Sequence, residues 1–192
     1  MKKKLLSLLL ALCLVMALVP MTAFAEGTSV DNWDGTADTS WYTDHKTDTE
    51  YHFTTAEQLA GMAKLINDDM ANFKDKTIYL ENDLDLGGHE WISIGDGANT
   101  DVGSFQGVFD GQSHVIYNLY SHEGLKSENK DNNNNLYRNG LFGSIYNATV
   151  KNLGIENADI VIPMNDTSTY GKGILVDWMT NSTIKNLSLI HI

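Results

Sequence analysis

The chain has 192 residues, with 13 basic side chains against 25 acidic ones and a formal net charge of −12. Nucleic-acid binding depends on Lys and Arg side chains that neutralise phosphates, so this composition excludes a nucleic-acid partner. Cys13 is the only cysteine, which excludes a disulfide within the chain and a metal site built from several thiolates.

Residues 1–25 have the organisation of a secretory signal peptide. Three Lys residues precede an apolar run over residues 5–19, and Ala23-Phe24-Ala25 supplies the small residues of a cleavage site. We predict cleavage after Ala25, secretion or display at the cell surface, and no membrane span in the mature protein. The alternative is an uncleaved anchor, but the apolar run is short for a membrane span.

The predicted mature chain is a single acidic domain. Residues 1–25 carry three of the 13 basic residues and no acid, which leaves ten basic against 25 acidic groups and a net charge of −15. The remaining chain, residues 26–192, is long enough to bury a hydrophobic core. An acidic surface favours solubility outside the cell.

Residues 26–52 are predicted to form an N-terminal leader segment that is rich in aromatic side chains. Trp33, Trp41 and Tyr42 lie in this segment, and Trp91 follows further along the chain. Aromatic rings on a β-sheet surface can stack on sugars, which makes these four residues the candidate carbohydrate-binding residues. The alternative is that they pack in the core and under the cap of the domain.

Two segments rich in side-chain oxygens are candidates for weak calcium binding. Asp31 to Gly35 and Asp96 to Asp101 both hold carboxylate and amide oxygens, which are the ligands that Ca²⁺ prefers. Neither segment matches the helix–loop–helix calcium motif, and Asp, Asn and Gly are also ordinary turn residues. No other cofactor or metal is predicted.

A helix is predicted over residues 55–69. Thr54, with Glu57 three positions later, has the pattern of a capping box. The apolar residues that follow recur on one helical face, namely Leu59, Met62, Ala63 and Ile66. An amphipathic helix placed before the strands can cover the open edge of a sheet, so we predict an N-terminal cap.

Residues 53–192 contain an internal repeat whose copies follow one another at a constant spacing. Short runs of β-branched and aromatic residues are bounded by Gly, Asn and Asp, which favours strands over helices. The aligned positions of the three copies are Ile116, Val150 and Ile184, then Asn118, Asn152 and Asn186, and then Leu119, Leu153 and Leu187. Units of this length bury their apolar faces by stacking on one another, so we predict an all-β fold, a parallel β-solenoid.

The predicted strands cover residues 77–80, 115–119, 148–155 and 160–162. In stacked strands, an Asn side chain can donate to one neighbour and accept from the other. Asn118, Asn152 and Asn186 are therefore predicted to form a structural ladder. Two polar stretches, residues 96–103 and 126–135, are predicted to be loops that leave the stack.

These segments resemble the GLUG-motif surface proteins of clostridia and related gut bacteria. Gly140-Leu141-Phe142-Gly143 matches the Gly-Leu-x-Gly core of that motif, and Gly173 to Val176 is a second copy without the closing Gly. The other segments that carry the resemblance, which spans about residues 33–190, are Trp33 to Thr36, Phe53 to Ala60, Lys76 to Leu86, Trp91 to Gly95 and Phe105 to Gly111. The resemblance implies a right-handed parallel β-helix, similar in outline to pectate-lyase-like folds, in a surface protein.

No catalytic residues are predicted. His89-Glu90 lacks the second His of a zinc-peptidase motif. Asp83 and Asp85 share one face of a predicted strand, as a glycosidase carboxylate pair would, but solvated acids opposite two buried Leu side chains explain them more simply. Arg138 is the only arginine that could serve as the base of a lyase.

The sequence therefore predicts a non-catalytic, exported segment that binds host glycan, polysaccharide or cell-wall material in the manner of an adhesin, or that displays another domain. The alternatives are a polysaccharide lyase or glycoside hydrolase and, from the resemblance, the non-catalytic N-terminal module of a larger surface peptidase. Because residues 187–192 stop inside a repeat, we also predict a fragment that lacks further strands or a wall anchor.

Overall fold

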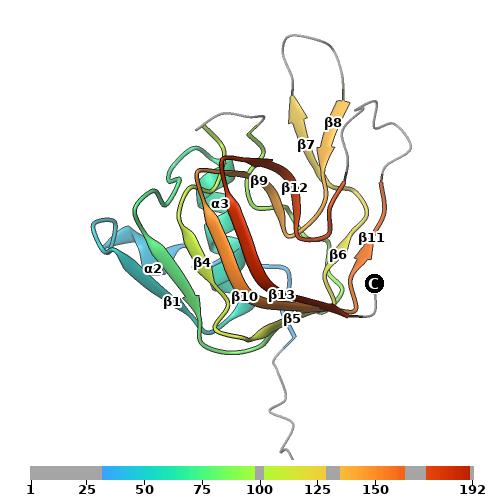
Figure 1. The fold of residues 1–192 in the computed structure, drawn as a ribbon, viewed down its shortest axis with the longest axis horizontal. Coiled ribbons are helices and arrows are strands. Elements are labelled where there is room, and N and C mark those ends of the chain that lie inside the picture. The colour runs from blue at the N-terminus through green and yellow to red at the C-terminus, as the bar shows by residue number, and fades with distance from the viewer. Residues whose placement is uncertain (1–31, 98–101, 129–134, 163–171, 191–192) are drawn as a thin grey trace, which may run out of the picture.

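The computed structural model describes residues 32–97, 102–128, 135–162 and 172–190 (Figure 1). The predicted signal peptide and its cleavage site lie outside these ranges. So do Asp31 and residues 98–101, which belong to the two predicted calcium-binding segments. The predicted leader segment is described from residue 32 onward.

Strands dominate the described chain, which confirms the predicted all-β class. The helices among these residues are α2 (Ser40–Thr43) and α3 (Ala56–Asn67). The strands are β1 (Glu50–Phe53), β2 (Thr77–Leu80), β3 (Leu84–Asp85), β4 (Val108–Asp110), β5 (Val115–Tyr117), β6 (Tyr120–Ser121), β7 (Leu125–Glu128), β8 (Asn135–Arg138), β9 (Phe142–Tyr146), β10 (Thr149–Glu156), β11 (Asp159–Ile160), β12 (Val176–Thr180) and β13 (Thr183–Ile190). Within the described ranges, every strand pair is parallel except β7 with β8.

The main sheet places strands from successive parts of the chain in parallel rows. From β1 the order runs through β2 and β4 to β10, and β13 pairs with the opposite edge of β10. The long strand β10 pairs with β4 along its first half and with β5 along its second half, and β5 pairs in turn with β3. Figure 1 shows β4, β10 and β13 side by side, with α3 behind them.

The pairing of β10 with β13 has the register that the repeat predicts, because Val150 lies opposite Ile184. The first copy of the repeat is aligned differently from the prediction. Ile116 pairs with Ile155, and Phe109 takes the place opposite Val150. The predicted equal spacing is wrong for this copy. Four residues lie between β4 and β5, whereas only two residues of β10 lie between the part that pairs with β4 and the part that pairs with β5.

Three two-stranded sheets complete the described structure. In the sheet of β9 and β12, Phe142 lies opposite Val176, so the predicted alignment of Gly140 with Gly173 is one position out of register. β6 pairs with β11 in parallel. β7 and β8 form an antiparallel hairpin, so the stretch predicted as a loop, residues 126–135, begins and ends in strands.

The GLUG-like segment needs its glycines because neighbouring backbone passes close to them. Gly140 has a φ of +34°, and a Cβ at this position would lie 2.3 Å from the carbonyl oxygen of Gly173. A Cβ at Gly143 would lie 2.2 Å from the carbonyl oxygen of Gly95. A side chain at either position would push adjacent rows apart, which explains why the motif has Gly at both ends.

Asparagine side chains join the rows by hydrogen bonds at the bends of the chain. Asn152 Nδ2 donates to Asp110 Oδ1 at 2.9 Å, and Asn186 Nδ2 donates to Asn152 Oδ1 at 3.0 Å. Lys151 Nζ also lies 2.9 Å from the Asp110 carboxylate. Although burial acts to raise it, hydrogen bonds from Lys151, Asn152 and the Gln112 backbone hold the pKa of Asp110 below its ordinary value. This ladder therefore starts at an ionised carboxylate, which can only accept.

Asn118 lies in a second ladder, not in the one predicted for it. Its Nδ2 donates to Asp85 Oδ1 at 2.7 Å, and its Oδ1 accepts from Asn157 Nδ2. Both ladders have the same order, with one Asp followed by two Asn, and every amide donates toward the preceding row. The two ladders therefore run along two different corners, and each joins corresponding positions of successive rows.

The ladder asparagines all have the left-handed backbone conformation. The φ angles of Asn118, Asn152, Asn157 and Asn186 are 55°, 53°, 57° and 54°. This conformation costs most residues roughly 1–2 kcal/mol, and Asn tolerates it better than other residues with a Cβ. Each of these Asn residues therefore bends the strand, and at the same point its side-chain amide donates a hydrogen bond to the preceding row.

Helix α3 begins one residue later than the capping pattern predicted. Thr55 is the N-cap: its side chain accepts from the Gln58 N–H, and Gln58 Oε1 accepts from the Thr55 N–H. The box is therefore Thr55 with Gln58, not Thr54 with Glu57. The predicted apolar face of the helix is buried in the core, at Leu59, Met62, Ala63 and Ile66.

Apolar side chains at matching positions of the rows form the core. Ile78 lies opposite Phe109, which lies opposite Val150, and all three side chains are fully buried. Each such side chain contributes about 1.5–3 kcal/mol by leaving water. The last row differs, because Leu189 and Ile190 in β13 are 42% and 45% exposed.

Replacement of Asn152 separates the two roles of a ladder residue. Asn152→Gly keeps the left-handed conformation but loses both side-chain hydrogen bonds, so we expect a loss of about 1–3 kcal/mol in the free energy of unfolding. Asn152→Ala adds the strain of the conformation and should cost roughly 1 kcal/mol more. Urea unfolding measures both variants. An Asn152→Gly protein as stable as the wild type would show that the ladder does not stabilise the fold.

Candidate functional site

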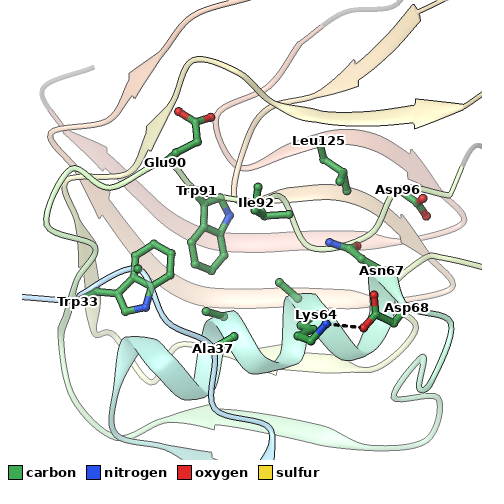
Figure 2. A pocket seen from close by; sticks show the side chains of 13 residues that line it. Trp33, Ala37, Lys64, Asn67, Asp68, Glu90, Trp91, Ile92, Asp96 and Leu125 are labelled. Atoms are coloured by element: carbon green, nitrogen blue, oxygen red, sulfur yellow. Dashed lines mark hydrogen bonds and ion pairs between the residues drawn. The ribbon is translucent and has the colours of Figure 1, made fainter.

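A pocket of about 410 Å³ lies between helix α3 and the segment from Glu90 to Asp96 (Figure 2). Its lining comes from the leader segment, from α3, from residues 90–96 and from Leu125 at the start of β7. Pockets that hold small molecules typically measure about 300–1,000 Å³, so this one is large enough for a small ligand.

One end of the pocket is aromatic. The rings of Trp33 and Trp91 meet edge to face with their centroids 5.5 Å apart. Their indole N–H groups are already used, by the Thr36 carbonyl at 2.6 Å and by the Leu141 carbonyl at 3.1 Å. Only 4% of Trp33 and 0% of Trp91 is exposed. The two rings therefore form a wall of the pocket and do not offer the open stacking platform predicted from the sequence.

The opposite end of the pocket is acidic. Figure 2 shows Asp96, Asn67 and Asp68 gathered there, with Ile92 and Leu125 between them and the tryptophans. Asp68 pairs with Lys64 Nζ at 2.7 Å. Apart from Glu90, which lies beside Trp91, the acidic groups of the lining thus lie at one end of the pocket, an arrangement that orients a ligand with one charged or polar end.

The Asp96 carboxyl is perturbed by its surroundings. Burial, followed by the negative charge of Asp69, raises the pKa of Asp96 above its ordinary value, and the positive charge of Arg138 opposes this shift. Asp96 is therefore a half-buried carboxylate that would gain from a positively charged neighbour.

Asn67, the last residue of α3, fixes the acidic end of the pocket. Its Nδ2 donates to the Ser93 carbonyl at 3.0 Å, and its Oδ1 accepts from the Gly95 N–H at 2.8 Å. One side chain thus satisfies two backbone groups of the segment that carries Asp96. This amide sets the distance between the helix and the far wall of the pocket.

Glu90 fixes the upper rim in a similar way. Its carboxylate accepts from the backbone N–H groups of His122, Glu123 and Gly124 at 2.8–3.2 Å. These bonds hold the turn that leads directly into Leu125. Glu90 is therefore a structural carboxylate whose lone pairs are largely occupied.

Two of the four predicted carbohydrate-binding residues lie away from the pocket. Trp41 packs edge to face against Tyr42, Tyr51 and Phe53, with centroids 4.7–5.7 Å apart. Tyr42 is buried, and the Tyr51 hydroxyl donates to the His45 carbonyl at 2.6 Å. Burial, with Tyr42 and Asp48 nearby, raises the pKa of Tyr51 to about 12. These residues form an aromatic cluster that packs beside β1.

The carboxylate pair considered for glycoside hydrolysis is used in the fold. Asp83 Oδ1 accepts from the Val115 N–H at 2.9 Å and lies 3.0 Å from His114 Nδ1. Asp85 Oδ1 accepts from the Gly87 N–H at 2.8 Å and from the Asn118 side chain. Neither residue lines the pocket.

Arg138, the candidate base of a lyase, is buried. It is 1% exposed, its Nη2 donates to the Gly97 carbonyl at 3.3 Å, and its guanidinium lies 5.7 Å from the centroid of the Trp178 ring. Arg138 therefore holds the backbone at Gly97, next to Asp96, and is not accessible to a ligand.

The described residues hold no group of three His, Cys, Asp or Glu side chains that is arranged to bind a metal ion. Four histidines pair with carboxylates instead, in the pairs His45–Asp48, His52–Glu81, His114–Asp83 and His122–Asp159. Over the same ranges, no helix has the length and hydropathy needed to cross a bilayer.

The comparisons with known proteins give no relative from which a function can be transferred. Comparison of the chain with protein-family models, with curated proteins and with solved structures finds no match in any of the three. The resemblance to GLUG-motif proteins therefore stays a prediction. A proposal for the function therefore depends on the geometry of the pocket.

The pocket combines residues that the sequence did not single out. Lys64 and Asn67 lie in α3, whereas Ile92 and Leu125 come from two other segments, and the four residues have no motif in common. Trp33, Trp91 and Asp96 were predicted for binding, but for different ligands. The sequence contains no signal that marks them, because the 45% exposure of Ile92 next to the fully buried Trp91 is known only from the fold.

Removal of the Asn67 amide should loosen the acidic end of the pocket. Asn67→Ala leaves the Ser93 carbonyl and the Gly95 N–H without their partner, so we expect a loss of about 1–3 kcal/mol in stability. Hydrogen exchange at the Gly95 amide should become faster. Asn72→Ala, at an exposed Asn whose side chain bonds to the Lys74 N–H, is the matched control. Unchanged exchange at Gly95 would contradict this role of Asn67.

Neutralisation of Asp96 should stabilise the protein at neutral pH. Because the folded state raises the pKa of this carboxyl, its ionised form destabilises the fold at high pH, and the penalty disappears as the pH falls below the ordinary Asp range. Asp96→Asn should therefore raise the urea midpoint at pH 7 but not near pH 3. Asp75→Asn, at an exposed turn, is the control. A lower midpoint for Asp96→Asn at pH 7 would show that the carboxylate is favourably paired.

Proposed function

We propose that the chain is an exported segment of a right-handed parallel β-helix that binds carbohydrate at a bacterial cell surface. The β-helix is supported by the parallel rows, of which β10 and β13 pair in the register of the repeat, and by the left-handed Asn residues at the corners. Export is supported by the signal-peptide pattern of residues 1–25. Surface display is supported by the resemblance to GLUG-motif proteins.

The observation that carries the binding proposal is the pocket between α3 and residues 90–96. It joins an aromatic wall to a polar end and is held by the side chains of Asn67 and Glu90. Sugars have apolar C–H faces and polar edges, and binding sites for them combine the same two surfaces. Because the rim is fixed by hydrogen bonds to the backbone, the pocket is formed before the ligand arrives.

A polysaccharide-degrading enzyme is the competing function, because Asp68, Glu90 and Asp96 all line the pocket. Glycoside hydrolysis needs two carboxyl groups that are free to act on the substrate. Glu90 is occupied by three backbone N–H groups, and Asp68 pairs with Lys64. Of the three, Asp96 alone is left for chemistry, so we propose binding without cleavage.

A glycan array with the recombinant chain tests this proposal, and NMR of the tryptophan indole N–H groups locates the ligand. The chain has four Trp residues, of which Trp33 and Trp91 line the pocket while Trp41 and Trp178 do not. We expect a bound glycan to shift the two pocket signals and to leave the Trp178 signal unchanged. Trp41→Phe and Trp178→Phe variants assign the spectrum.

A variant at the centre of the pocket provides the matched test. Ile92→Ser should weaken glycan binding at least tenfold, while Ile162→Ser, at a similarly exposed Ile outside the pocket, should not. Equal affinities in the two variants would place the binding site elsewhere. The absence of any glycan ligand would favour a structural display role, and release of reducing ends from a bound glycan would favour the enzyme.

A further inference from the structure

We propose that the pocket selects a sugar that carries a free amine, with the ammonium group at Asp96 and the apolar sugar face against Ile92 and Leu125. This inference rests on the proposed carbohydrate binding and names the class of sugar. It follows from the distribution of charge along the pocket.

The pocket lining carries three carboxylates and one ammonium group. The ammonium group, Lys64, is already paired with Asp68 at 2.7 Å. Glu90 is partly compensated by the backbone N–H groups that it accepts. Of the three carboxylates, Asp96 therefore carries the negative charge that its surroundings offset least, at the end of the pocket away from the tryptophans (Figure 2).

The surroundings of Asp96 add to its need for a cation. Asp69 brings a second negative charge close to it, and the carboxyl is half buried, which weakens its hydration. The positive charge nearby, Arg138, is buried on the other side of the Gly97 backbone. A ligand ammonium at the pocket end would neutralise Asp96 from the open side.

The rest of the pocket limits which cations fit. A bare metal ion needs several oxygen ligands, and the described residues do not form such a cluster. Ile92 and Leu125 instead present apolar surface beside the acidic end. An amino sugar carries both an apolar face and an ammonium group, so it matches both parts. Uronic acids would bring a carboxylate to an end that already holds Asp68 and Asp96, which disfavours them.

The test compares three disaccharides that differ in charge: diglucosamine with free amines, its N-acetylated form and digalacturonate. Calorimetric titration of the full chain at pH 7 should show diglucosamine binding at least tenfold more tightly than the acetylated form, and no digalacturonate binding. Asp96→Asn should remove most of this preference. Asp75→Asn makes the same change of charge at an exposed turn outside the pocket and should keep it.

The pH dependence provides a second measurement of the same contact. Lowering the pH from 7 to 4 also protonates the amines of diglucosamine more fully, so the readout is the difference between the two proteins. As Asp96 takes up a proton, the wild type should lose affinity relative to the Asp96→Asn variant. Among the described residues, the other charged groups that face Asp96 or the pocket are Asp69, Arg138, Lys64, Asp68 and Glu90. Because Asp96→Asn leaves all five unchanged, the comparison isolates Asp96.

The outcomes separate this inference from the proposed function. Equal binding of the acetylated disaccharide would overturn amine selection while carbohydrate binding stands. An equal loss of the preference for diglucosamine in Asp96→Asn and Asp75→Asn would show a general attraction of a cation to an acidic protein. That result would also overturn amine selection at Asp96. If none of these disaccharides binds and the glycan array is blank, carbohydrate binding fails and the selection fails with it.

Discussion

The hydrogen bonds between corner side chains in neighbouring rows are the interaction on which the rest of this structure depends. Each ladder Asn adopts a left-handed conformation that turns the chain, and its amide bonds to the same position in the preceding row. A shift of one residue would break these bonds and expose the buried side chains, because successive side chains of a strand face opposite ways. The hydrogen bonds at the corners and the burial of the core side chains therefore specify the same register of strand pairing.

The pocket exists because this register is fixed. Trp91 and Asp96 lie on a segment whose backbone is bonded at two points to the next row: the Trp91 N–H donates to the Tyr120 carbonyl and the Ile94 N–H donates to the Leu141 carbonyl. Helix α3 lies against the same core, and Asn67 joins the two parts with a single side chain. A site assembled from a helix and a loop is thereby as rigid as the strands that support them.

The acidic composition acts differently in the two parts of the molecule. In the ladders, Asp85 and Asp110 serve as acceptors at the starting ends, where each carboxylate receives hydrogen bonds. In the pocket, Asp96 is half buried next to another acid, and its own backbone N–H and the charge of Arg138 offset only part of that effect. The same residue type therefore stabilises a corner in one place and lies in surroundings that disfavour its charge in the other.

The sequence by itself determined the β class, the helix that precedes the strands and the register between β10 and β13, because apolar periodicity and turn residues are local signals. It misplaced Asn118, since the four residues between β4 and β5 change the spacing and only strand pairing shows which residues lie opposite each other. It took the tryptophans for open platforms, because exposure is a property of packing. The pocket was decided by tertiary structure alone: Lys64, Asn67, Ile92 and Leu125 carry no common motif until the folded chain brings them together.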